Sequence, residues 1–106
     1  MRTLLKVTID INAGNQAIQN GRLPQVIQQT LEKLKPEAAY FLTDNGERTT
    51  FIVFDLKDPS DIPVIAEPFF MELNAKVQFS PVMNQEDLKK GLANMAAGQP
   101  AAATSN

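Results

Sequence analysis

Residues 66–71 combine a carboxylate, a helix-breaking residue and an apolar wall, which makes them the stretch best suited to chemistry. Pro68 lies inside a helical pattern, so it should kink the helix and can open a cleft there. Glu67 would lie at that cleft as a general acid or base, with Phe69 and Phe70 lining an apolar ligand site. In the alternative interpretation, which is the commoner arrangement, Glu67 is a solvated surface carboxylate and the kink only wraps the helix over the sheet.

The chain contains no cysteine and no histidine. This composition removes disulfides, thiol nucleophiles, Cys/His zinc sites and imidazole bases, so proton transfer would fall to a carboxyl, a lysine or the Tyr40 phenol. Asp55, Asp58 and Asp61 do not have the spacing of a calcium loop, and roles at a helix N-terminus or on the surface explain them better. The sequence predicts a protein without a metal or redox cofactor.

Three further residues are candidates for orienting a substrate oxygen: Tyr40, Arg48 and Lys6. Lys6 also belongs to a polar set whose members would share one face of two adjacent strands: Lys6, Thr8, Asp10, Lys76, Gln78 and Ser80. A partner sheet would enclose this set in a polar chamber that could hold an acidic ligand. The other interpretation is a wet half-sheet that faces solvent.

A predicted β-hairpin over residues 38–56 organises the elements that must position these side chains. Asn45-Gly46 favours a tight type I′ turn, which places Tyr40 opposite Phe51 and Ala39 opposite Ile52. Both faces of the hairpin are then apolar, so both need cover, and either face could lie in an interface with a second copy.

The remaining elements follow from hydrophobic periodicity and capping residues. We expect a strand over residues 4–11, one short helical turn within residues 12–22, a helix from Pro24 to Lys35-Pro36, a second helix after residues 58–61, a strand over 75–82 and a last helix capped by Asn84. Residues 98–106 have nothing to bury, and we expect them to form a disordered tail.

This order predicts an α+β fold of the ferredoxin-like βαββαβ type with a C-terminal helix, as one domain over residues 1–97. Right-handed crossovers would give an antiparallel sheet in the order 4-1-3-2, with the two main helices on one face. The other face would carry apolar groups on two strands and polar groups on the other two.

The topology, length and half-apolar open face resemble the dimeric α/β-barrel superfamily, in which two ferredoxin-like sheets face each other. Residues 35–41 and 65–70 are also similar to bacterial proteins with no assigned activity. The resemblance implies a homodimer formed through the open sheet face. Cofactor-free monooxygenases of this superfamily use Asn, Trp and His positions, and this chain has no Trp or His, so their chemistry carries over to no residue here.

The charge of the chain argues against two classes of partner, nucleic acids and anionic membranes. With a net charge of −2 and a pI near 5.0, the chain offers no electrostatic reason to bind nucleic acid or an anionic membrane. No apolar run is long enough for a membrane span, and we expect a cytoplasmic protein.

Two functional hypotheses follow. One is an enzyme or carrier for an apolar, aromatic or acidic small molecule in the cleft between sheet and helices. The other is a non-catalytic dimeric binding or regulatory module. An enclosed cavity with converging polar groups would favour the first, and solid packing there would favour the second.

Overall fold

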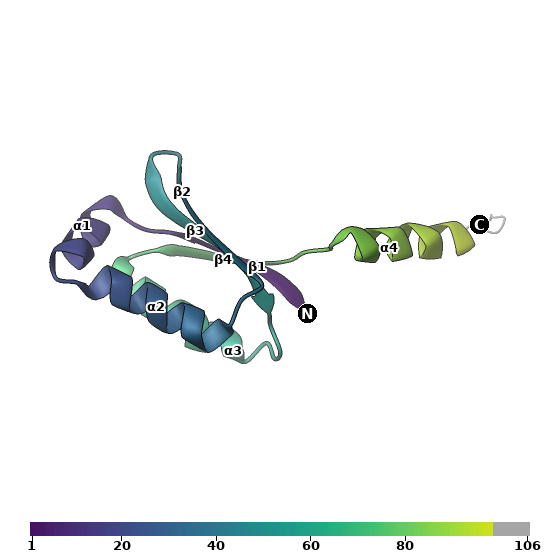
Figure 1. The fold of residues 1–106 in the computed structure, drawn as a ribbon, viewed down its shortest axis with the longest axis horizontal. Helices are drawn as coiled ribbons and strands as arrows, with labels where there is room; N and C mark the ends of the chain where they lie inside the picture. The colour runs from purple at the N-terminus through teal and green to yellow at the C-terminus, as the bar shows by residue number, and fades with distance from the viewer. Residues whose placement is uncertain (99–106) are drawn as a thin grey trace.

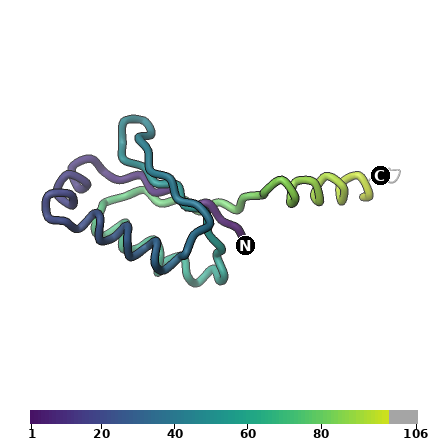
Figure 2. Tube along the Cα trace, in the orientation of Figure 1, coloured from purple at the N-terminus to yellow at the C-terminus, as the bar shows by residue number. Residues whose placement is uncertain are grey.

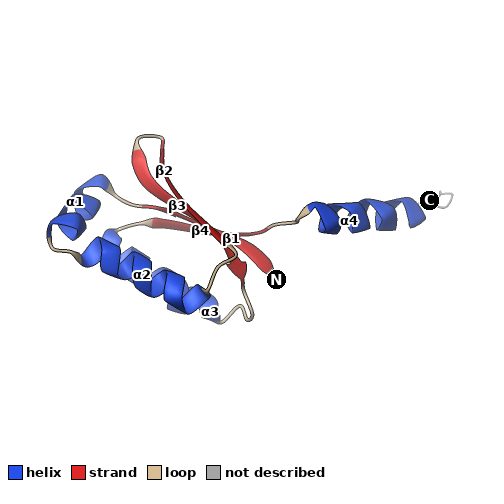
Figure 3. Ribbon diagram, in the orientation of Figure 1, coloured by secondary structure: helices blue, strands red, loops and turns tan. Residues whose placement is uncertain are grey.

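A computed structural model describes residues 1–98 of the chain, as four strands and four helices (Figures 1 and 3). The elements in chain order are β1 (Arg2–Thr8), α1 (Ile11–Gln19), α2 (Arg22–Leu34), β2 (Ala38–Asp44), β3 (Glu47–Asp55), α3 (Asp61–Leu73), β4 (Lys76–Pro81) and α4 (Gln85–Ala97). The predicted α+β class is confirmed. The predicted tail lies outside the described residues from residue 99 onwards.

The four strands form one sheet in the order β2-β3-β1-β4, with every neighbouring pair antiparallel. The arrangement is compatible with the ferredoxin-like plan. Asn45 and Gly46 have φ angles of 52° and 77°, as a type I′ turn requires. Tyr40 lies opposite Phe51 and Ala39 opposite Ile52, which confirms the predicted register of the hairpin.

Helices α2 and α3 lie side by side on one face of the sheet (Figure 1). The alternation of β1 follows from this cover, because its buried residues are Thr3, Leu5 and Val7 while the residues between them are only partly buried. Ile52 of β3 and Phe69 of α3 complete the centre of the core, both with no exposed area. No helix of residues 1–98 covers the opposite side of the sheet, which is called the open face below.

The prediction for residues 9–22 is wrong in two respects. The first strand ends at Thr8 and not at Ile11, and Asp10 is the N-cap of α1, whose carboxylate accepts a hydrogen bond from the Ala13 amide at 3.0 Å. The single expected turn is a helix of nine residues. Gly14 interrupts the sequence pattern but not the helix. A Cβ there would lie 2.6 Å from Nη1 of Arg48, so the glycine leaves room for that side chain.

Replacing Asp10 by alanine should therefore lower the free energy of unfolding by about 1 kcal/mol, the usual effect of losing an N-cap side chain. Urea denaturation at a fixed protein concentration measures the change. Asn12→Ala is the matched control, because Asn12 lies in the first turn of the same helix and is exposed. Equal effects of the two substitutions would contradict the capping role of Asp10.

The bounds of the two covering helices differ slightly from the expected ones. Helix α2 begins at Arg22, after Gly21 with a φ angle of 76°, and it ends one residue before Lys35, which takes the left-handed conformation. Helix α3 runs from Asp61 to Leu73 without interruption, with Pro68 inside it. The covering layer is thus two helices of 13 residues each.

Helix α4 projects away from the sheet and the other helices (Figure 2). The molecule is therefore elongated, with principal extents of 62 × 28 × 20 Å. Its predicted cap is confirmed, because Asn84 and Asp87 form a reciprocal capping box. None of its residues is buried. One ion pair joins it to the sheet, from Arg2 Nη1 to Asp87 Oδ2 at 3.2 Å.

Candidate functional site

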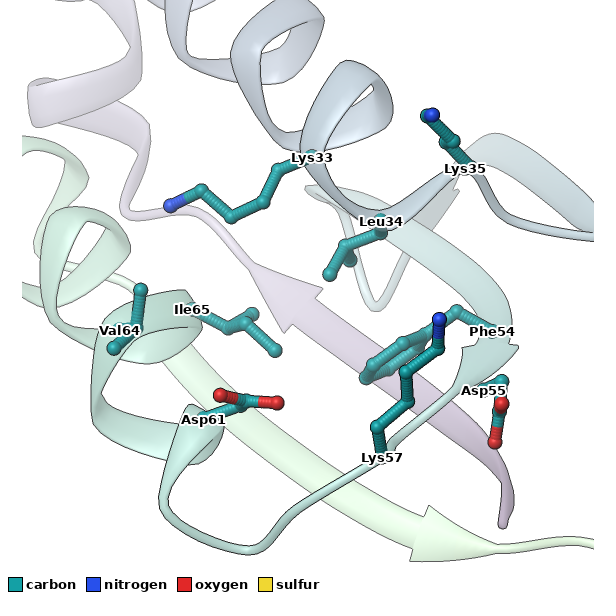
Figure 4. Close-up of a pocket in the computed structure, with 9 residues that line it drawn as sticks. All are labelled: Lys33, Leu34, Lys35, Phe54, Asp55, Lys57, Asp61, Val64 and Ile65. Carbon is teal, nitrogen blue, oxygen red and sulfur yellow. The ribbon is translucent and has the colours of Figure 1, made fainter.

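A cavity of about 490 Å³ lies between the C-terminal end of α2, the end of β3 and the first turns of α3. It occupies the cleft between sheet and helices in which the sequence predicts a ligand. Figure 4 shows the residues that line it: Lys33, Leu34, Lys35, Phe54, Asp55, Lys57, Asp61, Val64 and Ile65.

The floor of the cavity is apolar because three elements turn their inward-facing residues towards it. Phe54 comes from the helix-covered face of β3 and Ile65 from the buried side of α3, and both are core residues. Leu34 adds the last residue of α2, which is packed against this core. An apolar group of a ligand could replace water over these three side chains.

Three lysines stand at the rim of the same cavity. Lys33 lies in the last turn of α2, Lys35 caps that helix and Lys57 follows β3. Figure 4 shows Lys57 rising beside the Phe54 ring, Lys33 extending above Ile65, and Lys35 pointing away. Within residues 1–98, no carboxylate lies within 4.0 Å of any of the three ammonium groups.

Two carboxylates also line the cavity, but they differ in their availability. Asp55 points away from the floor (Figure 4) and accepts a hydrogen bond from the Met1 amino group at 2.6 Å, which lowers the pKa of that carboxyl. Asp61 lies in the first turn of α3, where a negative charge suits the helix dipole. Cations therefore outnumber available anions, and an acidic group of a ligand would be attracted.

The sequence-predicted site in α3 does not come together around this cavity. Glu67 lies on the exposed side of the helix and does not line the cavity. Phe69 has no exposed area, whereas the neighbouring Phe70 is 41% exposed. Glu67 and Phe70, three positions apart, share the exposed side of α3, whereas Phe69 points into the core, so the three side chains do not form one site.

Two other predicted site residues lie on the open face. Lys6 Nζ is 2.9 Å from Asp44 Oδ2 and 5.8 Å from the centroid of the Phe51 ring. Tyr40 lies opposite Phe51 and is 66% exposed. The ammonium of Lys6 is thus already paired with a carboxylate inside the same chain.

All members of the predicted polar set except Asp10 lie together on the open face. Thr8 lies opposite Lys76 and Lys6 lies opposite Gln78, which places both pairs across β1 and β4. Ser80 lies opposite Leu4 and so follows the same alternation.

Arg48 lies in a third place. Its Nη2 donates a hydrogen bond to Asn15 Oδ1 at 3.0 Å. It also lines an apolar groove of about 410 Å³ between α2 and the β2–β3 hairpin, called the α2–β2 groove below. Its other lining residues are Ile9, Leu23, Ile27, Phe41, Leu42, Thr43, Thr49 and Thr50. The predicted site residues are thus spread over three separate surfaces.

Sequence reasoning missed the three rim lysines. Lys33 and Lys35 lie at the end of a helical pattern and Lys57 lies just after a strand pattern, so in the sequence each looks like an ordinary surface residue.

Within residues 1–98, no group of three or more acidic side chains is placed to hold a metal ion. No helix in that part of the chain is long and apolar enough to cross a membrane.

The chain matches no family model, and no curated protein or solved structure shows significant similarity to it. Its function is therefore inferred from its own side chains.

Proposed function

We propose that this protein is a homodimer that binds a small apolar molecule bearing an acidic group, in the cavity between the sheet and its helices. The observation that carries the proposal is an apolar floor beside two lysines, Lys33 and Lys57, around a cavity of about 490 Å³; within residues 1–98 neither ammonium group lies within 4.0 Å of a carboxylate. Small-molecule sites span about 300–1,000 Å³, and the volume of this cavity lies within that range. Binding needs no metal or redox cofactor.

The size and chemistry of the cavity define the ligand class. Contact with Leu34, Phe54 and Ile65 favours an aliphatic or aromatic body. The ammonium groups of Lys33 and Lys57 favour a carboxylate or a similar anion at the mouth. A medium-chain fatty acid such as octanoate is a suitable probe of this class.

The homodimer is supported by the open face. Five large apolar side chains lie on it: Leu4, Tyr40, Leu42, Phe51 and Val53. Burial of each would contribute about 1.5–3 kcal/mol before the costs of association, so a sheet-to-sheet contact is favourable. Such a contact would give the ferredoxin-like, dimeric α/β-barrel arrangement.

A chain without cysteine also suits the reducing cytoplasm, where we place the protein.

Binding without conversion is the alternative that the geometry favours over catalysis. The titratable groups that line the cavity are Asp55, Asp61 and the rim lysines, and the Asp55 carboxylate is already engaged by the Met1 amino group, while Glu67 lies elsewhere. A non-catalytic module that responds to a metabolite would need only the floor and the rim. If the ligand is converted, Lys57 beside the Phe54 ring is the group best placed to take part.

Replacing Lys57 by glutamine should weaken octanoate binding about fivefold, which corresponds to about 1 kcal/mol for an exposed charge interaction. Isothermal titration calorimetry at low salt measures the dissociation constant directly. The uncharged analogue 1-octanol should bind the wild type and the variant with equal affinity, because only the carboxylate uses the ammonium group.

Lys89→Gln is the matched control, because Lys89 is exposed on α4 and outside the cavity. It removes the same charge from the chain and should leave octanoate affinity unchanged. Equal losses in both variants would mean that net charge and not the cavity governs binding. An absence of octanoate binding to the wild type at millimolar concentration would reject the ligand class.

A further inference from the structure

Helix α4 is an amphipathic element, and within residues 1–98 no other element buries its apolar side chains. Its three large apolar residues are Leu88, Leu92 and Met95, which are 47%, 52% and 59% exposed. Their spacing of four and then three residues aligns them on one narrow stripe, which is typical of a helix that packs against another helix. The capping box at Asn84 stabilises α4 as a helix before it meets anything.

The α2–β2 groove is an apolar surface that no other element of residues 1–98 covers. Leu23 and Ile27 line it from one side of α2, four residues apart, and Phe41 lines it from β2 and is 57% exposed. A helix lying along α2 would present its stripe to this row of side chains. Helix α4 has 13 residues, as α2 has, so both are about 20 Å long.

The two surfaces lie at diagonally opposite corners of the sheet. Helix α4 follows β4, whose last residue Pro81 pairs with Thr3 near the start of β1. The groove lies at the other edge strand and at the other end, where Phe41 pairs with Thr50. In one chain the helix therefore points away from the groove (Figure 1).

Two-fold packing of the open faces can bring these corners together between copies. Sheets pack either nearly aligned or nearly orthogonal. In the orthogonal case, the two-fold axis runs along one diagonal of the sheet. Each of the two corners that lie off this diagonal then faces the opposite corner in the other copy. The start of α4 in each copy then lies at the groove corner of the other copy but on the open side of its sheet, so the arm must turn around the edge strand β2 at residues 82–84 to reach the groove on the helix-covered side.

We propose that α4 of each copy is an exchanged arm that lies in the α2–β2 groove of a second copy, with Leu92 against Phe41. This inference rests on the homodimer proposed above and adds a second contact surface to it. The apolar stripe of the arm and the uncovered groove are then buried in one contact. The two arms of a symmetric dimer make this contact twice.

Engineered cysteines test the arm directly, because the natural chain has none. Leu92→Cys and Phe41→Cys are made as two separate full-length proteins, mixed in equal amounts, allowed to exchange subunits and oxidised. Both positions are exposed in the single chain, so both variants should fold. Mass spectrometry should show a disulfide-linked heterodimer of the two variants as the main product.

Asn94→Cys is the matched control, because position 94 lies about 200° around α4 from position 92. It should give at most a tenth of the linked product with Phe41→Cys. Equal linkage from positions 92 and 94, or linkage of Leu92→Cys mainly to itself, would overturn the docking in the groove. Sedimentation separates the two proposals: a dimer without cross-links overturns only the arm, and a monomer overturns the dimer and the arm together.

Discussion

Replacing Tyr40 by aspartate is expected to convert the homodimer into monomers at tens of micromolar protein. Tyr40 is 66% exposed in the single chain, so its loss should affect folding of the monomer little. In the proposed dimer the new carboxylate would be buried against the apolar residues of the second sheet without a partner. We expect the dissociation constant to rise at least 100-fold, which corresponds to about 2.8 kcal/mol.

Sedimentation velocity of both proteins measures this change, because the single chain has a mass of 11.7 kDa and the dimer has twice that mass. Met71→Asp is the matched control, since Met71 is 79% exposed on α3 and away from the open face. It introduces the same charge and should remain dimeric. A wild-type protein that sediments as a monomer at this concentration would reject the open face as an interface.

Replacing Phe69 by alanine should lower the free energy of unfolding by about 3–5 kcal/mol. Phe69 has no exposed area and belongs to the same buried cluster as Leu5, Ile52 and Leu73, so its removal leaves a cavity at the centre of the core. This loss is a large part of the total stability expected of a domain of this size. Urea denaturation at a fixed protein concentration measures it.

Phe70→Ala provides the comparison, because Phe70 is the next residue of α3 and is 41% exposed. It should cost less than about 1.5 kcal/mol, since only part of the ring is removed from water. If the two substitutions cost the same, the placement of Phe69 in the core and Phe70 at the surface would be wrong.

The hairpin was predictable because the residues that specify it are close together in the sequence. Asn45-Gly46 accommodates the positive φ angles of the turn, and the turn fixes the pairing of Tyr40 with Phe51. Periodicity alone could not decide which face of the hairpin the helices cover. In the structure Ile52 and Phe54 are buried under the helices, which leaves Phe51 and Val53 on the open face.

Helix α1 was not predictable as a helix of nine residues, because its sequence is rich in asparagine and contains Gly14. That glycine leaves room for a side chain distant in the sequence, since a Cβ there would lie 2.6 Å from Nη1 of Arg48. Asp10 continued the alternation of the first strand, so periodicity assigned it to the sheet although its carboxylate caps the helix.

The cavity could not be found from local patterns. Its lining comes from three stretches, residues 33–35, 54–57 and 61–65, which only the packing of α2 and α3 on the sheet brings together. Residues 66–71 resemble a site in the sequence because an acid, a proline and aromatic residues are adjacent there. Adjacent residues on a helix point in different directions, so such a run does not by itself build a site.

Mapping of octanoate on the folded protein by NMR tests the proposed binding site most directly. In ¹H–¹⁵N spectra of labelled protein, we expect octanoate to shift the amide signals of residues 33–35, 54–57 and 61–65, which surround the cavity. Signals of Tyr40 and Phe51 on the open face should move little. Shifts confined to the open face or to the α2–β2 groove, or no shifts at millimolar octanoate, would contradict the proposed site.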